Sequence, residues 1–277
     1  MQTRTNQKKR TMITLLNGEH WGKEEILAQM ADDDFYFNYL GKHALSQSLL
    51  KNILDDPHSY LKKLKGKEEK KTDALMMGSL VHWGYLEPNV FYSKKFIEAE
   101  RITDKPYKLA VEKYGSENVY KAKFQRIAES YIDALNRCDK LNDIKKNCEI
   151  EVPAIKMFFD DIPIRGKADL LASDTIYDLK TTMVNPNEFN KWKIINMHYD
   201  LQAFIYCQLF EVDYFSFIPI NKQNKAKGIV HCGKEILESG EEKFYKAMEK
   251  YKKYFYKKDI EESEYILDND CPEIIIG

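Results

Sequence analysis

The sequence has few cysteines, and those it has are poorly arranged for the sites that cysteines usually build. There are five, at positions 138, 148, 207, 232 and 271, and no two form a CxxC pair. Such a dispersed, odd set is poor material for a disulfide framework and favours a reducing compartment. It also lacks the paired spacing of zinc and iron–sulfur sites. We therefore interpret the cysteines as structural thiols.

Long hydrophobic runs are also missing. No apolar stretch approaches the ~20 residues that a membrane-spanning helix needs. The first ten residues are polar and basic, and no apolar signal-peptide core follows them. These absences predict a cytoplasmic protein with no membrane partner.

The sequence has no overall excess of positive charge, because its formal net charge is −1. Its charges are segregated, however. Residues 241–258 hold seven lysines against three acids, whereas the chain from Asp259 onward has seven acids and no Lys or Arg. Local charge sets the field that a ligand meets, so the net charge does not exclude a basic surface for nucleic acid.

Periodicity predicts an α/β fold with helices around a central sheet. We interpret residues 41–277 as a single domain and residues 1–40 as an N-terminal extension, helical or partly disordered. Apolar spacings of three and four predict helices over 21–54, 75–86, 118–141, 192–210 and 239–258. Residues 62–71 are expected to form an exposed loop. Strands are predicted at 149–157, 162–171, 175–182, 214–220 and 228–232.

The strands at 162–171 and 175–182 carry the charges that suggest chemistry. Asp178 and Lys180 are two residues apart on one strand, so both side chains lie on one face while Leu179 points to the other, into the core. An antiparallel partner strand would bring Asp169 alongside. Oxygen ligands at this spacing suit Mg²⁺ or Mn²⁺. A solvated ion pair is the alternative, but charges that interrupt core-forming strands are costly unless paired or metal-bound.

This pattern resembles a known catalytic signature. Gly166-x-x-Asp169, followed nine positions later by Asp178-x-Lys180, is similar to the motif of the PD-(D/E)xK nuclease superfamily. Within it, the chain resembles the RecE (exonuclease VIII) group of phage recombination exonucleases, relatives of the λ-type exonucleases. The resemblance implies a restriction-endonuclease-like core with a central mixed β-sheet flanked by helices.

Further motifs extend the resemblance over roughly residues 44–258. They are a Ser46-x-Ser48 helix start, the helix Gly78-Ser79-Leu80-Val81-His82, the pattern Tyr199-x-x-Gln202-x-x-x-Tyr206 and the closing lysine-rich helix. One position departs from the family: Ala168 stands where the family name has proline. The accessory acid is ambiguous, because Glu149 and Glu151 lie on one face of the same predicted strand; we prefer Glu151 for its distance to Asp169.

The resemblance also implies roles for individual residues. Asp169 and Asp178 would hold the metal together with the Leu179 carbonyl, and Lys180 would position and help deprotonate the attacking water. His82 would supply a nitrogen ligand or orient one; without the resemblance it would be a hydrogen-bonded packing residue. Glu151 would act on a second metal or on a water. The expected substrate-binding or bracing residues are Gln202, Tyr206, Ser46 and Ser48.

The implied function is that of a Mg²⁺-dependent exodeoxyribonuclease, with Mn²⁺ able to substitute. It would degrade one strand from double-stranded DNA ends, 5′ to 3′, as a homo-oligomeric ring beside a single-strand annealing protein. Two alternatives stay open, a structure-specific or defence endonuclease with the same core and a non-catalytic DNA-binding scaffold. The residues themselves do not decide strand polarity, processivity or the number of metals.

Overall fold

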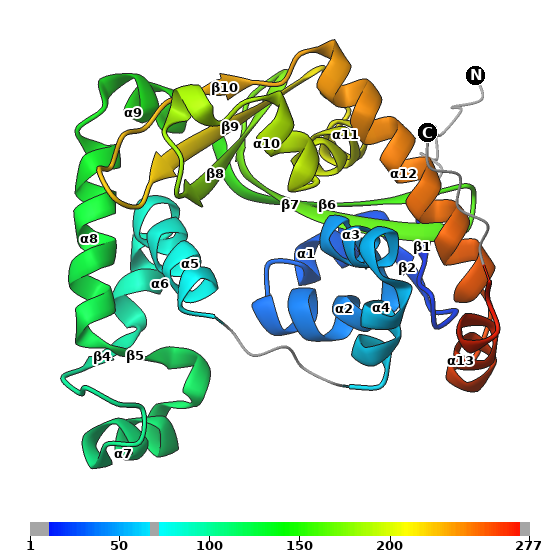
Figure 1. The fold of residues 1–277 in the computed structure, drawn as a ribbon, viewed down its shortest axis with the longest axis horizontal. Helices are drawn as coiled ribbons and strands as arrows, with labels where there is room; N and C mark the ends of the chain where they lie inside the picture. Colours follow the sequence, from blue (N-terminus) through cyan, green and yellow to red (C-terminus); the bar gives the residue numbers. More distant parts are fainter. Residues whose placement is uncertain (1–10, 67–71, 272–277) are drawn as a thin grey trace, which may run out of the picture.

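A mixed β-sheet lies at the centre of the computed structural model, which describes residues 11–66 and 72–271 (Figure 1). The strand order is β10-β9-β8-β7-β3, and β6 also pairs with β7. The pairs β6–β7, β7–β8 and β9–β10 are antiparallel, whereas β8–β9 and β3–β7 are parallel. The strands are β3 Leu45–Ser46, β6 Glu149–Phe158, β7 Ile162–Leu171, β8 Thr175–Thr182, β9 Tyr214–Asn221 and β10 Val230–His231. This confirms the predicted fold class.

The predicted sheet strands are found close to their expected bounds. β7 and β8 coincide with the predictions, β6 and β9 are each one residue longer, and β10 is shorter. The turn between β6 and β7 contains Phe159 and Asp160, whose φ angles of 51° and 71° lie in the left-handed region. β7, β8 and β9 are largely buried, and short apolar runs bounded by turn residues are what made their positions readable from the sequence.

Helices cover both faces of the sheet (Figure 1). On one face, Leu179, Ile218 and Ile220 pack against α5 and α8. On the other face, Phe215 and Phe217 pack against α10 and α11. The bounds on the first face are α5 Asp73–Leu86, α6 Pro88–Ser93, α8 Ala122–Asn136 and α9 Asp139–Lys146, and on the second α10 Lys191–Asn196 and α11 Tyr199–Phe210. The 3₁₀ turn η3, Pro186–Glu188, precedes α10.

The long helix α12, Lys234–Tyr254, packs on α11 and α3 and closes a second core. This core also contains Ile162 and Ile164 of β7 and residues of α3, α4 and α13. These helices are α3 Gln47–Asp55, α4 Pro57–Leu64 and α13 Ile260–Asp268. A smaller unit with β4 Lys95–Ile97, α7 Lys105–Tyr114, η2 Ser116–Asn118 and β5 Val119–Lys121 lies beside α6 and α8 (Figure 1).

The first described residues pack against the sheet. They form β1 Met12–Thr14, β2 His20–Gly22, α1 Lys23–Gln29, the π-helical turn η1 Phe35–Tyr39 and α2 Leu40–His43. Ile13, Ile26 and Leu40 are fully buried in one cluster with Ile155 of β6. The part of the expected extension within 11–40 is therefore ordered by core contacts; residues 1–10 lie outside the described ranges.

Three of the predicted helices are interrupted, and tertiary contacts explain the breaks. The helix expected over 21–54 is divided because Ala44 is extended, which lets β3 pair with β7. The prediction of a helix over 118–141 was wrong at its start, because residues 119–121 form the strand β5, which pairs in parallel with β4. The helix expected over 192–210 breaks at His198, whose φ is 56°.

Other bounds also differ from the predictions. The loop expected over 62–71 begins as the end of α4, and residues 67–71 lie outside the described ranges. α12 begins five residues before the predicted 239 and ends before 258, and the acidic tail forms α13. In contrast, α3 ends at Asp55, one residue after the predicted end at 54. No helix in the described parts of the chain is both long and apolar enough to cross a membrane.

We expect Gly240→Ala to destabilise the protein, because Gly240 lets α12 approach the backbone of α11. A Cβ atom there would lie 2.1 Å from the Asp200 carbonyl oxygen, so the helices would have to separate, at a cost of about 1–3 kcal/mol. Gly233→Ala is the matched control, since its Cβ would meet nothing within 4 Å. Urea denaturation checks this, and equal unfolding free energies for the two variants would contradict the packing described.

Candidate active site

The candidate site lies where β8 separates from β7. The β7–β8 ladder has only two pairs, Leu170 with Tyr177 and Leu171 with Ile176. Nearer the start of β7, at residues 164 and 165, the edge that faces β8 pairs with β3 instead. The opposite edge of β7 pairs with β6. Residues 166–169 of β7 thus face an opening between β8 and β3. At its border the Leu179 N–H donates to Asp169 Oδ2 at 2.8 Å, so a side-chain carboxylate takes the place of a backbone acceptor.

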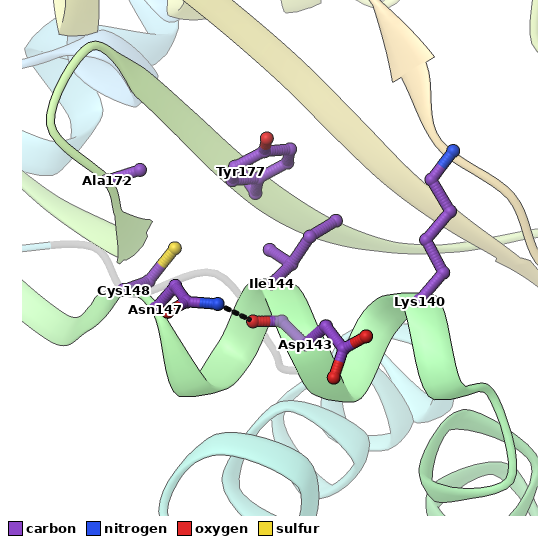
Figure 2. A pocket seen from close by; sticks show the side chains of 7 residues that line it. All are labelled: Lys140, Asp143, Ile144, Asn147, Cys148, Ala172 and Tyr177. Carbon is purple, nitrogen blue, oxygen red and sulfur yellow. Dashed lines mark hydrogen bonds between the residues drawn. The ribbon is translucent and has the colours of Figure 1, made fainter.

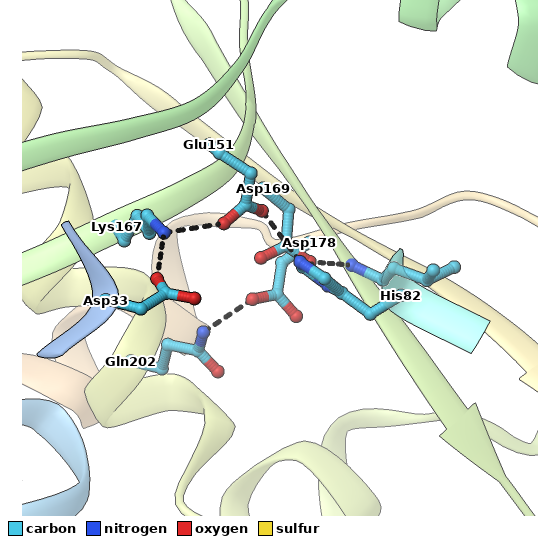
Figure 3. Close-up of polar contacts among 8 residues, drawn as sticks. Asp33, His82, Glu151, Lys167, Asp169, Asp178 and Gln202 are labelled. Carbon is cyan, nitrogen blue, oxygen red and sulfur yellow. Dashed lines mark hydrogen bonds and ion pairs between the residues drawn. The ribbon is translucent and has the colours of Figure 1, made fainter. Parts of the chain in front are cut away.

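Asp178 and Lys180 of β8 lie side by side in this opening. Lys180 Nζ is 2.6 Å from Asp178 Oδ2, and Gln202 Nε2 of α11 donates to Asp178 Oδ1 at 2.6 Å (Figure 3). Asp178 is only 3% exposed. Leu179 packs into the core with α5 and α8, as the strand alternation predicted. The arrangement fixes one oxygen of Asp178 through an amide and leaves the other beside an ammonium.

His82 of α5 joins two further carboxylates. Its Nε2 is 2.7 Å from Glu151 Oε1, and its Nδ1 is 3.5 Å from Asp169 Oδ2. One possible ligand atom from each of these three residues lies within 4.8 Å of the others. The structure thus brings His82, Glu151 and Asp169 together; their functional roles stay predictions.

Glu151 reaches this position through a local distortion of β6. Its φ of 55° is left-handed, and the β6–β7 ladder is regular on both sides but skips the Glu151–Asp169 pair. A non-glycine residue in this conformation costs on the order of 1–3 kcal/mol and tends to occur at functional sites. Glu149, by contrast, is exposed and pairs normally with Leu171. The two acids do not share one environment, and only Glu151 lies in the cluster.

The pKa values in the cluster reflect both burial and neighbouring charge. Burial raises the pKa of Asp178 to about 6, with help from the negative charge of Asp169 and against the opposing effect of Lys180. Burial lowers the pKa of His82, but Asp169 and Glu151 outweigh it and raise that pKa well above its usual range. Burial also opposes ionisation of Asp169, yet His82 and Lys180 hold its pKa below the ordinary value. The two carboxylates thus favour the protonated form of His82.

These groups line an open cleft of about 490 Å³. Sequence reasoning gave no role to several of its lining residues. They are Asp33, Phe37, Ala74, Leu75, Ser79, Trp83, Glu87, Lys167, Thr181 and Lys222. Lys167 could have been found, because it lies two residues before Asp169 on the same strand and so on the same face. Asp33 had no such signal, since only the tertiary packing of the N-terminal segment brings it to β7.

The predicted substrate-binding residues lie in different surroundings. Gln202 lies behind Asp178 and orients it. Tyr206 packs behind Gly166 of β7 and against Phe210 and Phe215, a bracing position. Ser46 is the N-cap of α3, accepting from Leu49 N, and its Oγ is 3.1 Å from that of Ser48. Neither serine is among the residues that line the cleft, so their contact with phosphate stays a prediction.

A second cavity, of about 430 Å³, lies against α9 (Figure 2). Among the described residues, it shares no lining residue with the first cleft. It is lined by Lys140, Asp143, Ile144, Asn147, Cys148, Ala172 and Tyr177. Burial raises the pKa of the Cys148 thiol, which makes it a poor nucleophile. The lining residues bring no converging set of acids or bases together, so the chemistry is better assigned to the first cleft.

The first cleft suits a divalent cation. Two or three carboxylates with one imidazole form a donor set that Mg²⁺ and especially Mn²⁺ accept. Asp178 Oδ2 is buried and accepts no hydrogen bond of good geometry from any described residue, although the Lys180 ammonium is close. A buried carboxylate oxygen that accepts no hydrogen bond is consistent with a role as a ligand of a cation. The residues that could hold the cation are Asp169, Asp178, Glu151, His82 and the Leu179 carbonyl.

Comparison with known proteins agrees with the fold. A family model described as a PDDEXK-like domain of unknown function (DUF3799) matches residues 46–265. The structure of a protein from Eubacterium rectale, provisionally named an exonuclease, matches with a TM-score of 0.59 and 18% identity, covering 89% of this chain and 95% of that one. At this identity the likeness supports the fold alone.

A phage-related exonuclease from Haemophilus somnus 129PT also matches, at 14% identity over 82% of this chain and 96% of that one. Its TM-score of 0.33 is too low to support an argument. No curated protein matches the sequence.

The raised pKa of Asp178 predicts a specific pH dependence of stability. Between its ordinary value of 3.8 and about 6, the folded protein binds more protons than the unfolded chain, so the free energy of unfolding falls as pH rises through that window. In chelator, we expect the wild type to lose about 2–3 kcal/mol relative to Asp178→Asn between about pH 4 and pH 7. Urea denaturation at several pH values measures this. Parallel pH profiles for the two proteins would show that Asp178 does not titrate as described.

Proposed function

The chain belongs to the PDDEXK-like family matched over residues 46–265, and on that premise we propose that it is a Mg²⁺-dependent deoxyribonuclease acting at double-stranded DNA ends. The observation that carries the proposal is the grouping of Asp169, Asp178 and Lys180 at the opening between β7 and β8. A binding module has no need of three charges in core-forming strands, where burial makes them costly.

Six residues at the cleft would then take part in phosphodiester hydrolysis. A bound divalent cation would lower the pKa of a water molecule and neutralise charge on the phosphate. Asp169 and Asp178 would hold it, with the Leu179 carbonyl, and Gln202 keeps Asp178 in its rotamer. His82 would supply a nitrogen ligand once it loses its proton. Glu151 would orient His82 through its contact with Nε2, and as the accessory acid it would act on a water.

Lys180 would act mainly through its charge. Burial lowers the pKa of its ammonium, but Asp178 and Asp169 raise that pKa above its ordinary value. The side chain is therefore protonated, which suits it to hold the attacking water and to stabilise negative charge that develops on the phosphate. The cation at Asp169 and Asp178 would supply most of the activation of the water.

We further propose exonucleolytic cleavage in the 5′ to 3′ direction, by a homo-oligomeric ring that works beside a single-strand annealing protein. The support is the resemblance of the motifs over residues 44–258 to those of the RecE group of phage recombination exonucleases. The near-neutral net charge requires that positive residues gather along the DNA path, because phosphate contacts dominate affinity.

Digestion of linear and covalently closed duplex DNA tests the function. With Mg²⁺ we expect loss of linear DNA only, and an effect of Asp178→Asn of about 10²-fold or more, matched by chelation. Agarose gels with end-labelled strands report both rate and polarity. Cleavage of closed circles would instead indicate an endonuclease, and intact DNA with retained binding would indicate a scaffold.

Glu151 and Glu149 offer a matched pair on one strand. We expect Glu151→Gln to lower activity by about 10–100-fold, because it loosens His82 in the cation site. Glu149→Gln should leave the rate unchanged, since Glu149 is exposed and outside the cleft. Initial rates on linear DNA measure both. Equal losses, or a loss only in the Glu149 variant, would show that the accessory acid is misassigned.

A further inference from the structure

Lys167 of β7 occupies the side of the Glu151 carboxylate opposite His82. Its Nζ is 3.3 Å from Glu151 Oε2 and 3.3 Å from Asp33 Oδ1, whereas His82 is bound to Glu151 Oε1 (Figure 3). One carboxylate thus bridges two cationic groups. Lys167 is not a mobile surface lysine, because its side chain is 15% exposed and lies over the Tyr36 ring.

Three carboxylates surround the Lys167 ammonium. Carboxylates from the N-terminal segment, the end of α5 and β6 approach it, namely Asp33, Glu87 and Glu151. All three line the same cleft as Asp169 and Asp178. Without a positive charge between them they would repel one another, and nucleases that use paired metals place a second ion among such acids.

Two features hold the ammonium in this place. The left-handed backbone at Glu151 interrupts the β6–β7 ladder, and its carboxylate lies between His82 and Lys167. Lys167 itself is anchored in the ladder opposite Pro153. Both Glu151 oxygens are thereby engaged, one by an imidazole and one by an ammonium.

We propose that the Lys167 ammonium is a built-in substitute for a second metal ion, so that the site takes one divalent cation. That cation would bind beside Asp169 and Asp178, and Lys167 would supply the second positive charge on the far side of Glu151. The inference rests on the proposed function, since it concerns the same cleft. It decides the number of metals, which the motif alone left open.

The test is the stoichiometry of Mn²⁺ bound to the full chain without DNA, by equilibrium dialysis and electron paramagnetic resonance. The wild type should bind one Mn²⁺ with the spectrum of an isolated ion. Lys167→Ala removes the charge and opens space, so a second Mn²⁺ should bind and broaden the spectrum through coupling between the ions. Lys167→Arg keeps the charge and should bind one.

Lys222→Ala is the matched control, because Lys222 lines the same cleft and no ion pair joins it to a described carboxylate. It should bind one Mn²⁺, as the wild type does. Two Mn²⁺ ions in the wild type would overturn the inference while leaving a metal-dependent nuclease intact, and so would a single ion in folded Lys167→Ala. No Mn²⁺ in the wild type would overturn the inference and the proposed function together. The wild-type count is decisive even if a variant fails to fold.

Discussion

The separation of β8 from β7 after the Leu170–Tyr177 pair is the constraint on which the site depends. If the ladder continued, backbone groups would fill the space that Asp169, Asp178 and Lys180 now share. Two features keep the strands apart: β8 follows β9 in parallel along its whole length, and β3 takes the edge of β7 further back. The Asp169 carboxylate then satisfies the Leu179 N–H that the lost ladder leaves without a partner. At this border of the gap, a side-chain carboxylate thereby replaces the backbone acceptor that a continued ladder would supply.

Buried charge in this gap is balanced locally. Asp178 is next to Lys180, Asp169 next to His82, and Glu151 lies between His82 and Lys167. The balance depends on elements far apart in the sequence. α5 supplies the imidazole, α11 supplies Gln202, and the close approach of α12 at Gly240 fixes α11. The left-handed backbone at Glu151 and the burial of Asp178 both lower the stability of the fold. Such a loss of stability at an active site is common.

Sequence alone predicted the parts of this site that follow from local periodicity. The two-residue repeat of a strand places Asp178 with Lys180 and away from Leu179, and it predicted the bounds of β7 and β8. The resemblance to a nuclease family added His82, which periodicity alone would treat as a packing residue. What could not be predicted depends on tertiary contacts: the β3 strand that breaks a helical segment, the backbone conformation of Glu151, and the arrival of Asp33 from the N-terminal segment. Lys167 was visible in the pattern, but its partners were not.

The central claim is that the opening between β7 and β8 is a cation site. The most direct test is a crystal soaked in Mn²⁺, with diffraction recorded at the manganese absorption edge. The account predicts an anomalous peak at a coordinating distance of about 2.0–2.2 Å from carboxylate oxygens of both Asp169 and Asp178. A peak only at surface acids such as Asp32 and Asp34, with none between Asp169 and Asp178, would contradict it.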